Sequence, residues 1–292
     1  MIIFSVIIPH HDIPDLLRRC LASIPDIPEV QVIIVDDNSS VDKVDFNNFP
    51  GKDRKYTTVV FDKSGGGAGR ARNIGMEHAE GQWLVFADSD DFFVNGAFDI
   101  LAKHKDDSKD IILFKADSVD SEDYSPSDRH LLLNKAIDDA LRGVITNRQA
   151  VLKLPAPWCK MFRRKYIQEK GALFDEIYAN NDMMFVLKAT CWAKEDAVAV
   201  ADEQLYTVTT RKGSLEDMKK TSPRNYLCML DVLIRCNKFC KDGTYDKRPI
   251  IVQVLRGLKL GPKTFWKALI LAVRERALFS GTTAIFKRLF KR

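Results

Sequence analysis

The amino-acid sequence predicts an α/β fold: a mostly parallel central sheet with helices on both faces, followed by a helical C-terminal extension. Runs of near-continuous apolar residues alternate with segments of helical periodicity, and two of these runs end in acidic residues. Near-continuous hydrophobicity is typical of parallel strands covered on both faces. With 292 residues and 46% hydrophobic content, the chain can also bury a large core without disulfides.

The first hundred residues are expected to alternate between strand and helix. The first strand is β-branched and stops at Pro9, and the segment after it has apolar residues three and four positions apart, as in an amphipathic helix. The third strand ends just before a glycine cluster. We expect strands at 4–9, 30–37, 56–61 and 82–91, and helices at 11–24 and 71–81.

Beyond Phe98 the pattern loosens, but the chain shows no internal repeat and no low-complexity linker. The second half is therefore expected to complete the same sheet. We expect strands at 110–116 and within 197–210, a loop at 118–130, and helices at 134–144, 158–171 and 180–193.

Cysteine usage and the N-terminal segment indicate a reducing compartment. The chain has six cysteines and no CxxC pair, and Cys236 and Cys240 lack His or Cys partners at the spacing of a zinc site. We therefore expect buried thiols. The N-terminal apolar run has no basic segment before it and no small-residue cleavage site after it, unlike a secretory signal. We expect a cytoplasmic protein.

Positive charge is concentrated at the C-terminal end. From Lys241 onward there are thirteen Lys or Arg residues and three acidic ones, so this tail carries +10 and the rest of the chain −5. Residues 264–292 place apolar side chains at helical spacing with basic residues between them, and no charge-free stretch approaches the roughly 20 residues of a membrane span. The tail suits the anionic inner face of a membrane. Alternatively, it is a solvated helix face packed on its own domain; without a nucleic-acid motif, we expect no nucleic-acid partner.

Acidic residues close two of the predicted strands. Asp36 and Asp37 end one strand, and Asp88, Asp90 and Asp91 end another. Ligands of open α/β sheets bind at the carboxyl ends of the strands, and a DxD spacing lets carboxylates face a divalent ion. Singly, each cluster is better explained by helix caps and turns than by a binding site. Together, on neighbouring strands, they predict a site for a cation and a phosphate group.

A glycine cluster at 65–69 precedes Arg70 and Arg72. Flexible backbone amides and two guanidinium groups at this position suit a phosphate. The cluster lacks the Lys-Ser/Thr pair of a P-loop and the spacing of the dinucleotide-binding fingerprint. It therefore names no particular nucleotide by itself.

Four motifs, SVIIPHHD, VIIVDDNSS, GGAGRARNIG and WLVFADSDD, resemble in order and spacing those of family 2 glycosyltransferases with the GT-A fold. PAPWCKMFRR, ANNDMMF and YTVTTRKGS are similar to later motifs of the bacterial polysaccharide-synthesis branch. The resemblance implies a nucleotide-sugar-binding half at 1–105, an acceptor-side half of the same domain at 106–215, and a helical, basic extension at 216–292.

The resemblance also implies roles for residues of the first half. Pro9 and the loop after it would border the nucleotide base, and Asp37 would bind that base, usually uracil. Arg72 would lie near the nucleotide and Asp88 near the ribose. Asp90 would hold Mn²⁺ or Mg²⁺ against the donor diphosphate.

In the second half, Asp182 matches the acid that acts as the catalytic base in this family. Lys160 and Arg211 are further candidates for contact with the diphosphate. The chain departs from the family pattern at Asn181, where Glu is commoner, and at His10, where Tyr is frequent. From its position alone, Asp182 is also a good N-cap for the helix that follows it.

The implied reaction is transfer of a sugar, with inversion, from a nucleotide diphosphate donor to a hydroxyl group of a glycan or lipid-linked acceptor. A sugar nucleotidyltransferase is an alternative, but its glycine-rich loop normally follows the first strand. A signalling receiver module would be less than half as long, with its acidic pair after the first strand. A non-catalytic scaffold of the same fold is a third alternative.

Overall fold

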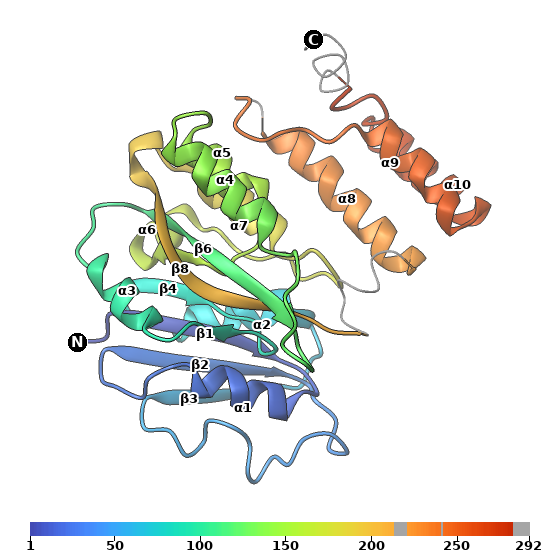
Figure 1. Ribbon diagram of the computed structural model, residues 1–292. Helices are drawn as coiled ribbons and strands as arrows, with labels where there is room; N and C mark the ends of the chain where they lie inside the picture. The colour runs from blue at the N-terminus through green and yellow to red at the C-terminus, as the bar shows by residue number, and fades with distance from the viewer. Residues whose placement is uncertain (213–220, 241, 283–292) are drawn as a thin grey trace.

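The computed structural model, which describes residues 1–212, 221–240 and 242–282, is built around one eight-stranded sheet (Figure 1). The strand order is β3-β2-β1-β4-β7-β6-β8-β5. The neighbouring pairs β1–β2, β1–β4, β2–β3 and β6–β8 are parallel, while β7 and β5 pair antiparallel with their neighbours. The strands are β1 (Phe4–His10), β2 (Val30–Asp37), β3 (Thr57–Asp62), β4 (Trp83–Phe86), β5 (Phe92–Phe93), β6 (Ile111–Asp120), β7 (Lys160–Arg163) and β8 (Val198–Thr210).

Helices cover both faces of this sheet, as the sequence predicts. α1 and α2 lie on opposite faces of β1 and β2 (Figure 1), and α2 packs so closely on β1 that a Cβ atom on Gly75 would stand 2.4 Å from Ile7. The helices are α1 (Pro14–Ala22), α2 (Gly67–Glu77), α3 (Ala97–Lys103), α4 (Leu131–Leu141), α5 (Asn147–Lys153), α6 (Arg164–Lys170), α7 (Met183–Trp192), α8 (Pro223–Phe239), α9 (Ile250–Arg256) and α10 (Pro262–Arg274).

Two expectations for the second half are wrong. Residues 158–171 were expected to form one helix, but Lys160–Arg163 form β7, and α6 begins only at Arg164. β7 lies between β4 and β6, where Met161 and Phe162 are completely buried, so the sheet overrides the local helical pattern. β6 also continues to Asp120, into the expected loop, because it pairs along its length with β8.

The C-terminal extension is helical, as expected. α8, α9 and α10 share a small apolar core of their own and lie beyond α7 (Figure 1). Among the described residues, no helix combines the length and apolar content that a membrane span requires. The last part of the predicted amphipathic tail, residues 283–292, lies outside the described residues.

Candidate functional site

The predicted donor residues gather at one edge of the sheet. β1 pairs in parallel with both β2 and β4, so the carboxyl ends of these three strands meet there. Pro9 ends up opposite Val35, one residue before the Asp36–Asp37 pair, and Asp88 follows β4. The sheet thus brings the first and last acidic motifs of the N-terminal half together, as the parallel pattern predicts.

Of the two strand-end acids on β2, Asp36 is an internal anchor. Its carboxylate lies 2.8 Å from His10 Nδ1 and accepts hydrogen bonds from the hydroxyl and the backbone N–H of Ser39. Burial acts to raise the pKa of Asp36, but the hydrogen bonds from His10 and Ser39 outweigh it, and the pKa lies below its usual value. His10, at the position where the chain departs from the family pattern, is buried with its ring edge against Phe49.

Asp37 is turned instead toward the glycine cluster. Its Oδ1 accepts a hydrogen bond of 3.0 Å from the N–H of Gly67, at the start of α2. Burial raises the pKa of Asp37, and this hydrogen bond opposes the rise. At Gly69, two residues after Gly67 on α2, an added Cβ atom would lie 2.1 Å from the carbonyl oxygen of Asp175. The start of α2 is therefore pressed against the segment that leads to α7.

Arg72 connects three parts of the candidate site. Its buried guanidinium donates hydrogen bonds to Asp88 (2.5 Å) and to the side-chain oxygen of Asn181 (2.9 Å), and it stacks over Phe174. Asp88 balances the charge of Arg72, and the neutral amide of Asn181 accepts a further hydrogen bond from it. The network joins α2, the acidic loop after β4 and the start of α7.

The other two acids of the DSDD motif have different surroundings. Asp91 is buried and accepts a 2.7 Å hydrogen bond from the backbone N–H of Thr209. Burial, and then the negative charges of Asp90 and Asp88, raise the pKa of Asp91 well above its usual value. Asp90 is more open and pairs with Arg211, whose Nε lies 3.0 Å from Oδ2. Asp88 and Asp90 are thus each held by one arginine.

Lys160 and Asp182 lie next to this network. The ammonium group of Lys160 is completely buried and donates hydrogen bonds to the carbonyl oxygens of Ala156 (2.6 Å) and Leu154 (3.3 Å). Burial lowers the pKa of Lys160 to about 8, against the smaller raising effects of Cys159 and of Asp182. Asp182 is the N-cap residue of α7, but its side chain makes no capping hydrogen bond.

A cavity of about 720 Å³ lies away from these residues. It opens near the amino ends of β1 and β2, between the end of α1 and the start of α3. Its lining combines apolar side chains with Glu29, Asp99 and Lys105. None of the predicted donor-binding residues lines it.

Known proteins resemble the chain in sequence. The poly(ribitol-phosphate) beta-glucosyltransferase of Bacillus spizizenii is 27% identical over 245 residues, which are 80% of this chain and 36% of that protein. The poly(ribitol-phosphate) beta-N-acetylglucosaminyltransferase TarS of Staphylococcus aureus is 24% identical over 232 residues, or 77% of this chain and 39% of TarS. The chain thus spans less than two fifths of the length of these relatives.

Solved structures share its fold. A crystal structure of S. aureus TarS 1–349 in complex with UDP-GlcNAc matches with a TM-score of 0.68 and 18% identity, over 95% of this chain and 82% of that one. The mannosyltransferase PcManGT of Pyrobaculum calidifontis, in complex with GDP-Man and Mn²⁺, matches with a TM-score of 0.57 and 16% identity, over 99% and 81%. The predicted GT-A fold is confirmed.

A family model shows to which family the chain belongs. The family model described as "Glycosyl transferase family 2" matches residues 5–171, from β1 through α6, which is more than half of the chain. This stretch contains the strand-end acids, the glycine cluster and Arg72. The chain belongs to glycosyl transferase family 2.

Proposed function

We propose that this protein transfers a sugar, with inversion, from a nucleotide diphosphate donor, a UDP-sugar, to a hydroxyl group of a glycan or lipid-linked acceptor in cell-surface polysaccharide assembly. One observation carries the proposal: Asp88 and Asp90, at the carboxyl edge of the sheet, are each paired with an arginine, Arg72 and Arg211. Relatives named for the glycosylation of poly(ribitol-phosphate), and the complex of TarS with UDP-GlcNAc, support the choice of donor and acceptor class.

The donor would lie along the carboxyl ends of β1, β2 and β4. Pro9 and Asp37 would border the base, since they close adjacent strands, and Asp88 would face the ribose. Arg72 and Arg211 would approach the phosphates, because each guanidinium already faces an anion at this edge. Lys160, which is bonded to loop carbonyls, would support this edge through its positive charge.

The residues present fit a hard divalent cation. Carboxylate oxygens are the ligands that Mg²⁺ and Mn²⁺ favour, and the raised pKa of Asp91 reflects, after burial, the negative charge that Asp90 and Asp88 concentrate there. Asp90 is the residue that would hold the ion, with Arg211 giving up its pairing. When bound, the ion would neutralise charge that develops on the departing diphosphate. The Mn²⁺ complex of PcManGT supports this assignment.

Asp182 would remove the proton of the acceptor hydroxyl. Its neighbour Asn181 is hydrogen-bonded to Arg72, which in turn holds Asp88, so the base is fixed relative to the donor site by two side-chain contacts. The chemistry requires this separation of roles, because the acceptor attacks the anomeric carbon from the side opposite the leaving diphosphate. Inversion follows from a single such displacement.

Thermal unfolding with and without UDP and Mn²⁺ tests the donor site, since a ligand of the folded state stabilises it by about 2.7 kcal/mol at 100 times its Kd. We expect metal-dependent stabilisation of the native chain and its loss in Asp90→Ala. Asp106→Ala is the matched control, because that carboxylate is 85% exposed and lies outside the site. No response to UDP, GDP or CDP would instead favour a scaffold without a donor.

The geometry favours a glycosyltransferase over a sugar nucleotidyltransferase. The glycine cluster follows β3 and begins α2, whereas β1 ends at His10 and the loop after it begins with His11. The end of β1 is tied to β2 by the contact of His10 with Asp36, and the loop by the hydrogen bond between His11 Nδ1 and the carbonyl oxygen of Asp37. The glycine-rich loop that normally follows the first strand of a sugar nucleotidyltransferase is thus not found after β1.

We further propose that the reaction takes place in the cytoplasm, with the chain resting on the anionic inner face of a membrane. The support is the outer surface of the C-terminal extension, where Trp266, Ile270 and Val273 are exposed one turn apart on α10. Apolar and basic side chains alternate around them, as in an interfacial helix. The exposed basic residues from the end of α9 to the end of α10 are Arg256, Lys259, Lys263, Lys267 and Arg274.

A further inference from the structure

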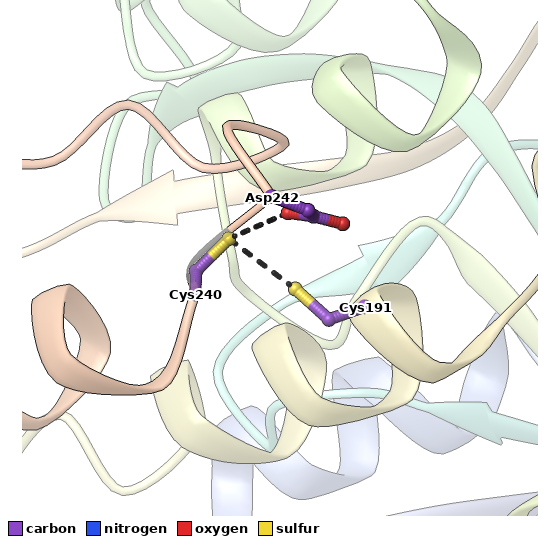
Figure 2. Close-up of side chains that lie close together, drawn as sticks. All are labelled: Cys191, Cys240 and Asp242. Carbon is purple, nitrogen blue, oxygen red and sulfur yellow. Dashed lines mark hydrogen bonds between the residues drawn. The ribbon is translucent and has the colours of Figure 1, made fainter.

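Two cysteines and an aspartate from distant parts of the chain meet beside the ends of α7 and α8 (Figure 2). Cys191 is the penultimate residue of α7. Cys240 is the C-cap residue of α8, and Asp242 lies two residues after Cys240. Cys240 Sγ lies 3.7 Å from Cys191 Sγ and 3.2 Å from Asp242 Oδ1. One ligand atom from each residue falls within 4.8 Å of the other two.

We propose that Cys191, Cys240 and Asp242 bind one Zn²⁺ ion. Two thiolates at about 2.3 Å from a common ion with tetrahedral geometry stand about 3.8 Å apart, and the observed separation of the two sulfur atoms is 3.7 Å. A disulfide would require the two atoms to approach to about 2 Å. Thiolate and carboxylate ligands together suit zinc better than Mg²⁺ or Ca²⁺, which favour oxygen alone.

The burial of the three ligands leaves the site open on one side. Cys240 is buried and Cys191 partly buried, whereas the side chain of Asp242 is 50% exposed. Solvent therefore reaches the site beside the carboxylate. This gives the ion a route of entry and provides a water molecule as the fourth ligand of a tetrahedral site.

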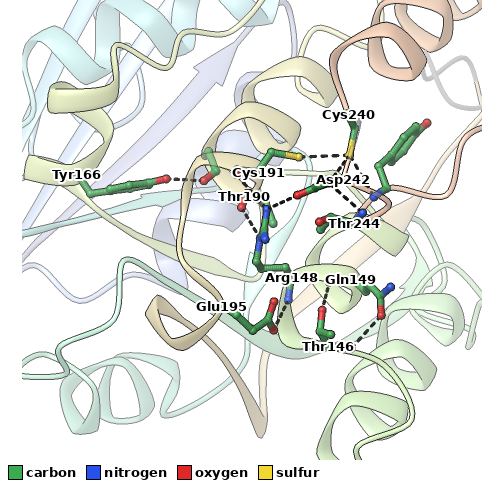
Figure 3. A network of polar contacts seen from close by, with 12 residues as sticks. Thr146, Arg148, Gln149, Tyr166, Thr190, Cys191, Glu195, Cys240, Asp242 and Thr244 are labelled. Carbon is green, nitrogen blue, oxygen red and sulfur yellow. Dashed lines mark hydrogen bonds and ion pairs between the residues drawn. The ribbon is translucent and has the colours of Figure 1, made fainter.

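The surrounding groups balance the charge of such a site and hold its ligands. Arg148 donates hydrogen bonds to Asp242 Oδ2 (3.1 Å) and to the carbonyl oxygen of Cys191 (2.9 Å) (Figure 3). Two thiolates and a carboxylate around a doubly charged ion leave one net negative charge, which Arg148 offsets. The backbone N–H of Thr244 donates to Asp242, and that of Tyr245 to Cys240 Sγ. Such outer contacts fix the orientation of metal ligands.

The ion would fasten the C-terminal extension to the sheet-bearing part of the chain. It would join the end of α7 to the end of α8, next to the edge-to-face contact of Trp192 with Phe239. α7 is the helix that begins after Asp182. The site is separate from the acidic edge of the sheet, and the proposal does not depend on the proposed transfer reaction.

Titration of the metal-free full-length chain with Zn²⁺ against a colorimetric zinc chelator tests the proposal. We expect one equivalent of Zn²⁺ to bind. Asp242→Asn and Cys240→Ser should weaken binding by about 10- to 100-fold or more, because the loss of a residue that only supports a metal ligand already costs that much. Cys228→Ser is the matched control, because this partly buried cysteine on α8 donates to the carbonyl oxygen of Ala179, outside the cluster. It should bind as the native chain does.

Two further measurements distinguish this site from others. Zn²⁺ should slow the reaction of Cys191 and Cys240 with a thiol reagent, and Asp90→Ala should retain the Zn²⁺ equivalent even though it loses the response to UDP and Mn²⁺. Asp242→Asn changes an exposed side chain, so its circular dichroism should match that of the native chain. The proposal is wrong if the native chain binds no Zn²⁺, or if Asp242→Asn and Cys240→Ser bind it as tightly as the native chain.

Discussion

The side chain of Asp182 has two roles open to it, helix cap and catalytic base. It stands at the N-cap of α7, next to Asn181, whose hydrogen bond to Arg72 places it beside Asp88 and the proposed donor site, as the catalytic role requires. We expect Asp182→Asn to lower the turnover number about 10²- to 10⁴-fold, the usual contribution of a general base. The affinity for UDP should not change, because Asn keeps the size and shape of the side chain and Asp182 is not one of the residues proposed to hold the donor. Steady-state kinetics and UDP titration measure the two effects separately.

Asp106→Asn serves as the control for this substitution, since it makes the same change at a solvated position. The turnover number of Asp106→Asn should equal that of the native chain, and only Asp182→Asn should be slower. Near-normal transfer by Asp182→Asn would remove this residue from the role of base.

Single residues also mark the limit of what the sequence predicts. The strand-end motifs located Asp37, Asp88 and Asp90 correctly at one edge, because parallel strands end together. The contact of Arg72 with Asn181 joins positions 109 residues apart, and no local pattern carries it. The proposed zinc ligands could not be predicted for the same reason: Cys191 and Cys240 are 49 residues apart, far beyond the short spacings that identify a zinc site in a sequence.

At the scale of elements, α2 fits closely against the segment before α7, with no room for a side chain at Gly69. In an open helix Ala is favoured over Gly by about 1 kcal/mol. At Gly69, however, the added Cβ would lie 2.1 Å from the carbonyl oxygen of Asp175 and 2.9 Å from Asn181. We expect Gly69→Ala to reduce the free energy of unfolding by about 1–3 kcal/mol, as overpacking does, as measured by urea denaturation.

Gly257→Ala is the comparison, because the Cβ there would meet its nearest atom at 3.4 Å, an ordinary contact. It should leave the free energy of unfolding nearly unchanged. Equal stability of the two variants would show that the segment before α7 yields without cost.

The first three strands of the N-terminal half were predicted well, since each is a continuous apolar run flanked by turn residues. The strand expected at 82–91, however, ends at Phe86, and Asp88, Asp90 and Asp91 lie in the loop after it. β7 was not predicted, because four residues between longer helical patterns carry too little periodicity to identify a strand. Its conformation is decided by partners on β4 and β6, both distant in sequence. The short β5 depends in the same way on its pairing with β8.

At the scale of the whole molecule, the exposed apolar surface of α10 predicts which side of the protein faces a membrane. We expect the native chain to partition onto vesicles of phosphatidylcholine and phosphatidylglycerol, and the double substitution Trp266→Ser and Ile270→Ser to weaken partitioning at least several-fold. These side chains are 58% and 63% exposed, so their loss should not disturb the fold. Sedimentation with vesicles measures the bound fraction, and added salt should lower it.

Leu131→Ser on α4 is the matched control, because Leu131 is 57% exposed but lies outside the C-terminal extension. It should partition as the native chain does. If the double substitution binds vesicles as well as the native chain, the surface of α10 does not attach the protein to a membrane.

The position of β7 also governs how the chain can fold while it is being made. Trp83 on β4 pairs with Arg163, so the N-terminal parallel strands have an open hydrogen-bonding edge until β7 has left the ribosome. At about 5–20 residues per second, the intervening eighty residues take roughly 4 to 16 s to synthesise. During this interval the nascent sheet exposes the unpaired backbone of an apolar strand. A chaperone that covers this edge would therefore act on the nascent chain before β7 closes it.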